Sequence, residues 1–238
     1  MKSRYIFIGD IHGCFTELSR LLDKIGPTAE DEVVSVGDFV GKGPGADRCL
    51  MIWQGAGFKA VQGNMDAAFV DWTEGKREIE PGQLRDTLEP LATNTMFPLY
   101  LKSLPLFLDY PEIGVTVVHG GLYPDMKINK EEMESREGVI ALRYLRKDGK
   151  GDGWSMVPTG KQKKGDVFWS ELWDGDRMII YGHTPQKTGK PKVDKQAIGI
   201  DLGCVFGGFL TAAIYLPEKG YWDFQLVKAE KQYAPWPK

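Results

Sequence analysis

The chain has 238 residues, enough to bury a full hydrophobic core, and it most simply forms a single domain over 1–238. Its 30 Lys and Arg residues against 33 Asp and Glu residues give a net charge of -3, which argues against a DNA-binding protein and against a membrane-surface protein. No apolar run reaches the roughly 18 residues of a membrane-spanning helix, and the first predicted strand leaves no room for a signal peptide. Three scattered cysteines, Cys14, Cys49 and Cys204, suit a reducing compartment, so we expect a cytoplasmic protein in which they are small buried apolar residues.

The first predicted strand ends in a polar motif. Residues 6–8 form an apolar run that leads into Gly9-Asp10-Ile11-His12-Gly13, and the apolar spacing that follows predicts a helix over 15–25. A buried parallel strand that delivers a carboxylate and an imidazole from its carboxyl end is typical of ligand sites in α/β proteins. Taken alone, the motif fits an ordinary turn equally well, with Asp10 capping a helix and His12 facing solvent.

The same pattern of strand, polar loop and helix repeats twice. A second predicted strand, 32–36, runs into Gly37-Asp38, and a third, 58–61, ends at Gly63-Asn64-Met65-Asp66. A helix is predicted after each strand. This repetition predicts a parallel sheet in which the strand-end loops gather at one edge.

The rest of the chain is more mixed. Residues from about 71 to 100 combine charges with a Pro-Gly break and predict a helical insertion with a helix near 83–92. A helix is also predicted over 131–145, and the Gly- and Lys-rich stretch 147–165 predicts a mobile surface loop. The remaining predicted strands are 106–109, 115–118, 178–181, 197–200, 209–215 and 221–227.

All three histidines follow predicted strands and sit beside glycine. His12, His119 and His183 would share one cleft edge with the carboxylates of Asp10 and Asp38 and the amide of Asn64. That inventory suits two divalent cations of the Mn, Fe, Zn or Co type, which accept mixed nitrogen and oxygen ligands, with Asp38 as the natural bridge. The alternative is that several of these groups only cap helices or fill hydrogen bonds.

In order along the chain, these motifs resemble those of the calcineurin-like metallophosphoesterases, with the closest likeness to the phosphoprotein-phosphatase branch. Within that branch, residues 37–44 and 198–208, followed by Leu210-Thr211-Ala212, are similar to the versions in bacterial symmetrical dinucleoside-tetraphosphatases. The resemblance spans about residues 4–215. It implies a four-layer α/β/β/α fold with two mixed sheets.

The resemblance also implies a dinuclear metal centre that is the catalytic centre. Asp10, His12 and Asp38 would hold one metal, and Asp38, Asn64, His119 and His183 the other. The metals would be two divalent ions, with Mn²⁺ preferred and Fe, Zn, Co or Ni as alternatives. A hydroxide bridging such a pair would attack phosphorus in line, without a covalent enzyme intermediate.

Three further positions bear on the substrate phosphate. Asn64 would contact it directly, Lys42 stands where many relatives have an arginine, and Arg143 resembles a second phosphate-binding arginine of the tetraphosphatase-like members. A solvated arginine on a helix face is the alternative interpretation of Arg143. The tryptophans 154, 169 and 173 are candidates to stack a base, although core positions are favoured for side chains of this size.

The third motif departs from the family pattern. Met65 stands where relatives have a histidine that protonates the departing oxygen, and Gly41 stands where its aspartate partner would be. Neither replacement can donate a proton. This predicts a preference for phosphoanhydrides and activated esters over alkyl phosphomonoesters.

The leading hypothesis is therefore a metal-dependent phosphohydrolase acting on nucleoside polyphosphates of the diadenosine tetraphosphate type. A protein serine/threonine phosphatase is the alternative reading, and the loss of the acid weighs against it. A phosphodiesterase and a metal-binding interaction module without catalysis are weaker alternatives.

Overall fold

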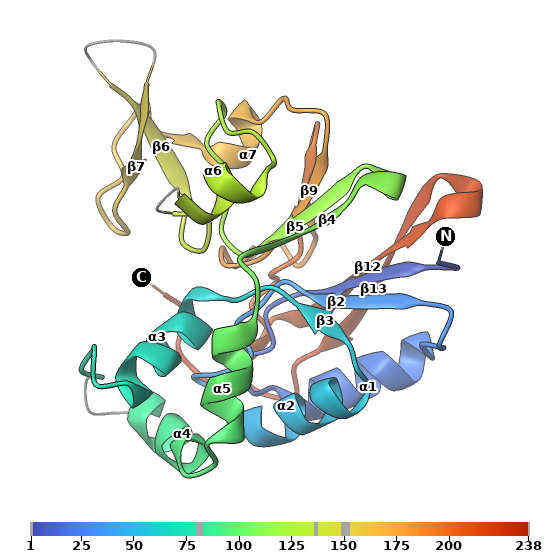
Figure 1. Ribbon diagram of the computed structural model, residues 1–238, viewed down its shortest axis with the longest axis vertical. Coiled ribbons are helices and arrows are strands. Elements are labelled where there is room, and N and C mark those ends of the chain that lie inside the picture. Colours follow the sequence, from blue (N-terminus) through green and yellow to red (C-terminus); the bar gives the residue numbers. More distant parts are fainter. Residues whose placement is uncertain (1, 80–82, 136–137, 149–152, 238) are drawn as a thin grey trace.

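The computed structural model describes residues 2–79, 83–135, 138–148 and 153–237, and in it two five-stranded sheets lie face to face (Figure 1). The first sheet has the order β13-β12-β1-β2-β3, in which β1, β2 and β3 run parallel and β12 and β13 pair antiparallel. Its strands are β1 (Tyr5–Ile8), β2 (Glu32–Ser35), β3 (Lys59–Ala60), β12 (Phe209–Leu216) and β13 (Tyr221–Lys228). The predicted parallel arrangement of the first three strands is confirmed.

The second sheet has the order β10-β11-β9-β5-β4. Its central strands β11, β9 and β5 run parallel, and each edge strand pairs antiparallel with its neighbour. Its strands are β4 (Phe107–Tyr110), β5 (Val115–Val118), β9 (Met178–Tyr181), β10 (Lys192–Asp194) and β11 (Ala197–Gly199). Both sheets are therefore mixed, as expected.

The two sheets share a core that follows from the alternation of side chains along a strand. In β1, Tyr5 and Phe7 pack toward the second sheet, where they meet residues such as Val117 and Ile180. Their neighbours Ile6 and Ile8 point to the opposite face and pack against helices. Because β1 is buried on both faces, its sequence is an unbroken apolar run.

Helices and a small third sheet form the outer layers. Five helices cover the outer face of the first sheet: α1 (Phe15–Ile25), α2 (Ala46–Gly55), α3 (Asn64–Thr73), α4 (Gln83–Ala92) and α5 (Met96–Ser103). The outer face of the second sheet packs against α6 (Lys130–Ser135), α7 (Trp169–Leu172) and the sheet β7-β6-β8, formed by β7 (Trp154–Val157), β6 (Tyr144–Lys147) and β8 (Val167–Phe168). Short 3₁₀ turns are η1 (Pro111–Ile113), η2 (Cys204–Phe206) and η3 (Pro217–Lys219). The four-layer expectation is confirmed.

The helix predicted over 131–145 is wrong beyond its first turns. Helix α6 ends at Ser135, and the chain then turns at Gly138, whose φ of +108° a helix does not allow, before it enters β6. The apolar residues Val139, Leu142 and Leu145 imitate a helical period, but they are buried in the core under the second sheet.

The stretch 147–165, predicted as a loop, contains strand β7, which pairs antiparallel with β6. Residues 149–152 lie outside the described residues, and the mobility of this stretch, like the single-domain organisation, stays a prediction. The predicted helix at 83–92 coincides with α4, within an insertion that also holds most of α5.

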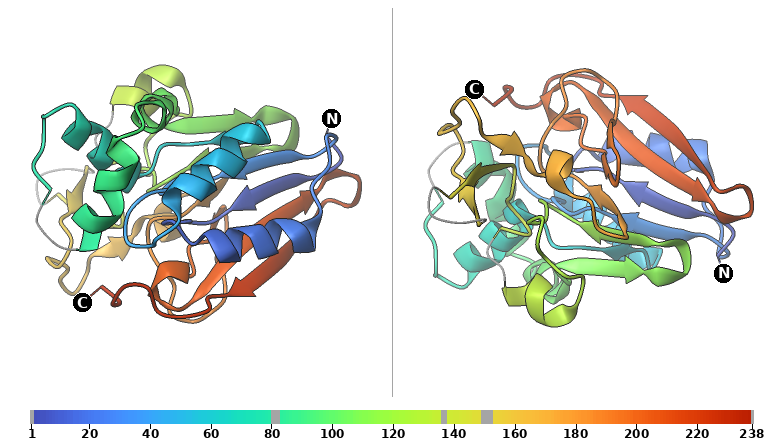
Figure 2. Two further views of the ribbon diagram at one scale, coloured as in Figure 1. Left: turned by 90° about the horizontal axis from the view of Figure 1, so that it is seen from below. Right: turned by 90° about the horizontal axis from the view of Figure 1, so that it is seen from above.

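The two termini lie at opposite ends of the molecule. In both views of Figure 2 the carboxyl terminus lies at the end where the parallel strands deliver their loops, and the amino terminus lies at the other. In the described part of the chain, no helix combines the length and the apolar character needed to cross a membrane.

Candidate active site

Loops from the first sheet bring three predicted ligands together. Asp10 and His12 follow β1, and Asp38 follows β2. The Nε2 atom of His12 lies 3.9 Å from Asp10 Oδ2 and 3.5 Å from Asp38 Oδ2, and one ligand atom from each of the three residues lies within 4.8 Å of the others. His12 is oriented by its other ring nitrogen, which lies 3.1 Å from the carbonyl oxygen of Val40. All three side chains are buried.

The second sheet contributes the other two histidines. His119 follows β5 and His183 follows β9, and the nearest nitrogens of both rings approach Asn64 Oδ1, at 3.0 Å and 2.6 Å. His119 Nε2 also lies 3.5 Å from Asp38 Oδ1. Asp38 therefore faces His12 with one carboxylate oxygen and His119 with the other, the arrangement expected of a ligand shared by two cations.

The site is built on unusual backbone conformations. In the described part of the chain, the non-glycine residues with positive φ are His12 (45°), Asp38 (54°), Lys42 (68°) and His183 (65°). All four were predicted site residues. Because this region of φ and ψ is unfavourable for residues other than glycine, the surrounding structure must hold them there.

Two glycines allow the carboxylates to approach the backbone closely. A Cβ atom on Gly182 would lie 2.0 Å from Asp10 Oδ1, and one on Gly63 would lie 2.1 Å from Asp38 Oδ1. No side chain fits at these distances, so the glycines of the third and fifth motifs are required by the packing around the predicted ligands.

Two acidic residues belong to the site although the sequence analysis gave them no role. Asp66 accepts hydrogen bonds from the backbone N–H groups of Asp38, Phe39, Val40 and Gly63, and so fixes the loop that carries Asp38. Asp201 follows β11 and lines a cavity beside the predicted ligands. Asp201 has the signal used for the other ligands, a carboxylate at a strand end, and Asp66 lies within the third motif.

Burial and neighbouring charges shift the pKa values of the aspartates in the site. Burial, helped by Asp38, raises the pKa of Asp66 to about 7 and that of Asp201 to about 6. Burial also raises the pKa of Asp10, with Asp201 adding to the effect, whereas the histidines and Lys42 overcome burial and lower the pKa of Asp38.

The histidines respond in opposite directions. Burial and Lys42 lower the pKa of His12 to about 3, while Asp38 and Asp10 overcome burial and raise the pKa of His119 to about 9. The site thus holds more buried carboxylates than positive charges to balance them. The side-chain atoms that could bind a metal ion are nitrogen and oxygen atoms. This donor set fits divalent cations.

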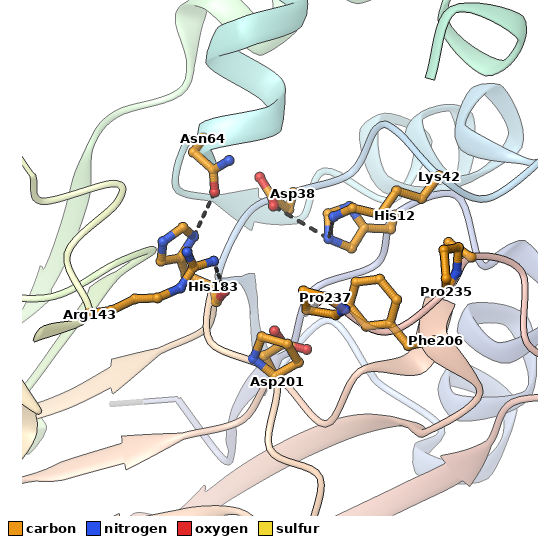
Figure 3. Close-up of a pocket in the computed structure, with 12 residues that line it drawn as sticks. His12, Asp38, Lys42, Asn64, Arg143, His183, Asp201, Phe206, Pro235 and Pro237 are labelled. Carbon is orange, nitrogen blue, oxygen red and sulfur yellow. Dashed lines mark hydrogen bonds and ion pairs between the residues drawn. The ribbon is translucent and has the colours of Figure 1, made fainter. Parts of the chain in front are cut away.

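Both predicted phosphate-binding cations face the same cavity (Figure 3). Lys42 Nζ lies 3.0 Å from His12 Nε2 and 5.2 Å from the ring centre of Phe206. Arg143 is not on a helix: it precedes β6 and donates hydrogen bonds to Thr159 Oγ1 (2.9 Å) and to the carbonyl oxygen of His183 (3.0 Å). The interpretation of Arg143 as a helix-face residue is therefore wrong.

The cavity has a polar side and an apolar side. Its volume is about 290 Å³, and an apolar wall beside the predicted ligands is formed by Pro185, Phe206, Ala234, Pro235 and Pro237. The C-terminal tail is held there because the N–H groups of Tyr233 and Ala234 donate to the carbonyl oxygen of Val205, at 2.9 Å and 3.0 Å. Trp236 packs on Phe206 with ring centres 5.2 Å apart. Phe206 lies within the motif at 198–208, but nothing in the sequence predicted that the C-terminal tail would complete this wall.

The tryptophans proposed as stacking residues lie elsewhere. Trp169 and Trp173 are buried in the core under the second sheet, and Trp154 packs against that core. The interpretation of these residues as core is confirmed. The three cysteines are buried and free, as expected.

Met65 lies on the other side of Asn64. Both residues line a second cavity of about 510 Å³, together with Ile79 and Leu88. The N–H of Met65 donates to Asp38 Oδ1 at 2.8 Å, so its backbone supports the site although its side chain cannot exchange a proton.

Comparison with known proteins accounts for this arrangement. The model of the calcineurin-like phosphoesterase family matches residues 3–209. The chain belongs to the calcineurin-like phosphoesterase family. It is therefore a metal-dependent hydrolase of phosphoric esters or anhydrides.

Individual relatives show which members of the family this chain resembles. The bis(5'-nucleosyl)-tetraphosphatase PrpE [asymmetrical] of Oceanobacillus iheyensis is 30% identical, over 90% of this chain and 89% of its own. A zinc-dependent endopolyphosphatase of Saccharomyces cerevisiae is 23% identical over 97% of this chain and 82% of its own. The name of the first relative specifies asymmetrical cleavage, whereas the sequence motifs resemble those of symmetrical enzymes.

Solved structures agree with the fold. The structure of a proposed diadenosine tetraphosphatase superposes with a TM-score of 0.76 at 27% identity, covering 96% of this chain and 95% of that one. A serine/threonine phosphatase of Saccharomyces cerevisiae superposes with a TM-score of 0.60 at 17% identity, covering 97% of this chain and 80% of that one. The second likeness concerns the fold alone.

Proposed function

We propose that this phosphoesterase hydrolyses dinucleoside polyphosphates of the diadenosine tetraphosphate type. The observation that carries the proposal is the cavity beside the predicted ligands, which combines Lys42 and Arg143 with an apolar wall. A nucleotide has the same two parts, an anionic phosphate chain and a flat apolar base. The relatives named as tetraphosphatases support this assignment.

Two divalent cations are proposed for the six residues named from the sequence. Asp10, His12 and Asp38 would hold one, and Asp38, Asn64, His119 and His183 the other. When bound, such a pair polarises a phosphoryl oxygen and makes a water-derived nucleophile available near neutral pH. Mn²⁺ is the first choice because the donors are mixed nitrogen and oxygen atoms, and the zinc dependence of the yeast relative makes Zn²⁺ the next ion to test.

The protein side chains position the substrate. Arg143 is held in place by its bonds to Thr159 and His183, so its remaining N–H groups are ready to bind a phosphate oxygen. Lys42 adds a point charge on the opposite side of the cavity. Phe206 and the neighbouring prolines offer a face for the base.

The volume of the cavity favours a nucleotide over a folded phosphoprotein. At about 290 Å³ it lies at the small end of ligand-binding sites, and the tail residues form part of its wall. A phosphoserine on a protein surface would have to displace that tail. We also propose a cytoplasmic location, which the three free thiols support.

A substrate panel tests the proposal. The Mn²⁺-loaded enzyme is assayed with diadenosine tetraphosphate, inorganic polyphosphate, an activated phosphodiester and phosphoserine peptides. We expect the highest kcat/KM with the dinucleotide, and chromatography should show the mono- and triphosphate products of asymmetrical cleavage. Two diphosphate products would indicate symmetrical cleavage instead. Turnover of phosphopeptides alone would reject the proposal, and no turnover even of an activated aryl phosphate would revive a non-catalytic role.

A further inference from the structure

A second cluster of metal-ligating side chains lies in the core between α1 and the segment after β11. Cys14 directly precedes α1, Glu17 is in its first turn, and Cys204 begins η2. One ligand atom from each residue lies within 4.8 Å of the others. Their exposed fractions are 1%, 0% and 2%, so all three are sealed from solvent.

Glu17 is not satisfied by its protein neighbours. Its Oε1 atom accepts hydrogen bonds from the N–H of Glu230 (2.9 Å) and the hydroxyl of Tyr233 (3.0 Å). Its Oε2 atom is buried and has no hydrogen-bond partner among the described residues. A carboxylate is almost never fully buried unless it is paired, and a buried oxygen without a partner destabilises the fold.

The thiols beside Glu17 do not supply a compensating positive charge. A hydrogen bond with Cys14, burial and the nearby Glu17 carboxylate together raise the pKa of the Cys204 thiol. A neutral thiol is a weak donor, whereas a cation that displaces the thiol protons would gain two thiolates and one carboxylate as ligands.

We propose that Cys14, Glu17 and Cys204 form a structural site for a divalent cation of the Zn²⁺ type, separate from the catalytic centre. Thiolate sulfur favours Zn²⁺ over Mg²⁺, Ca²⁺ or Mn²⁺. Around a tetrahedral zinc ion, ligand atoms lie roughly 3.5 Å apart, so the three groups, now within 4.8 Å of one another, need to close by at most about 1.3 Å. Binding releases the two thiol protons, and the fourth position falls to the Tyr233 hydroxyl or to water.

Such a cation would connect three segments that border the active site. Cys14 follows the loop that carries His12, and Cys204 follows the loop that carries Asp201. Glu17 holds the C-terminal tail through Tyr233, next to the residues that wall the cavity. The site would therefore stabilise the fold and the tail without taking part in the reaction.

Cobalt spectroscopy tests the site in isolation from the catalytic metals. The protein is stripped of metal under a phosphine reductant and titrated with Co²⁺. A sulfur-to-cobalt charge-transfer band reports only this site, because the predicted catalytic ligands are nitrogen and oxygen atoms. Once all sites are filled, we expect a band with the intensity of one thiolate-bound cobalt per chain in the wild type and in Cys49→Ser, the matched control in the same core. It should be absent in Cys14→Ser and Cys204→Ser.

A second measurement avoids substitutions in the core. X-ray absorption at the zinc edge of the Zn²⁺-loaded wild type should show sulfur neighbours at about 2.3 Å. Only nitrogen and oxygen neighbours, with no cobalt–sulfur band at any metal concentration, would overturn the proposal and leave the cysteines as ordinary core residues. A single reactive thiol in the unreduced, denatured protein, rising to three on reduction, would also overturn it in favour of a disulfide.

Discussion

Asp38 is the carboxylate that faces both halves of the site, with His12 near one oxygen and His119 near the other. Because it is the proposed shared ligand, Asp38→Asn should lower the Mn²⁺ content of the Mn²⁺-loaded enzyme from two equivalents and reduce kcat by about 10²-fold or more. Elemental analysis and kinetics on the same preparation measure both effects. Asp174→Asn, at an exposed position, is the control. Two bound equivalents with unchanged activity in Asp38→Asn would reject the shared ligand.

The residues Met65 and Gly41 are predicted to limit which leaving groups the enzyme can expel. Met65 lines the second cavity and cannot protonate a departing oxygen. Loss of general-acid help typically costs a factor of ~10²–10⁴, but only for basic leaving groups. We therefore expect kcat/KM to fall steeply along a series of esters with increasing leaving-group pKa. A flat profile would show that another residue supplies the proton.

At the scale of elements, the segment 138–147 shows where pattern reasoning fails. Val139, Leu142 and Leu145 have helical spacing, yet the positive φ of Gly138 and the pairing of β6 with two other strands make this segment a turn and a strand. The spacing of apolar residues indicates which residues are buried, and a buried turn can have the same spacing as a helix. The strands β1, β5 and β9 were predicted correctly because they are short and are followed within two residues by glycine.

Arg143, the proposed phosphate ligand just before β6, is held in place by two hydrogen bonds. Arg143→Lys should keep the charge but lose the fork that binds Thr159 and the His183 carbonyl. We expect KM for diadenosine tetraphosphate to rise about tenfold with a smaller change in kcat, since the substitution removes mainly binding. Lys161→Arg, at an exposed position, is the control. An unchanged KM would remove Arg143 from the substrate site.

The junction of α1 and β2 carries a pH-dependent contribution to stability. Asp31 accepts hydrogen bonds from Arg4 (3.0 and 2.6 Å) and from the N–H of Thr28 (2.8 Å). Although burial opposes them, these bonds lower the pKa of Asp31. A carboxyl whose pKa is lower in the folded state stabilises the fold above its unfolded pKa, about 3.9, and loses that contribution as the pH falls.

Asp31→Asn should therefore lower the free energy of unfolding by about 1–2 kcal/mol at pH 7, with a smaller difference from wild type near pH 3. Urea denaturation measures the difference in the free energy of unfolding between the two proteins. Both proteins are saturated with metal above pH 6 and are metal-free at lower pH. A constant difference across the whole range would contradict the assignment to the ionised carboxylate.

At the scale of the molecule, the site draws on both sheets. Asp10, Asp38 and Asn64 come from strands of the first sheet, and His119 and His183 come from the second. The sequence predicted that the ends of these five strands carry the ligands, because that signal is local. It could not assign the strands to two sheets, because pairing between distant segments leaves no local pattern. The apolar wall that the C-terminal tail forms with Phe206 was missed for the same reason.

The apolar wall formed by the C-terminal tail and Phe206 leads to a prediction about substrate binding. Trp236 packs on Phe206, and an aromatic pair contributes about 0.5–1.5 kcal/mol beyond area burial. Trp236→Ala should raise KM for the dinucleotide about five- to tenfold while leaving kcat/KM for a small aryl phosphate unchanged. Tyr221→Ala, an exposed aromatic on β13, is the control. Equal losses on both substrates would show that the tail supports the metal site rather than the base.

The four residues held at positive φ have a consequence for how this sequence changes over evolutionary time. At about 1–3 kcal/mol each, their strain is comparable to the whole net stability of a typical domain, about 5–15 kcal/mol. Glycine at His12, Asp38, Lys42 or His183 would relieve this strain, at the loss of a side chain from the site. Selection for stability alone would therefore not keep these four side chains in place.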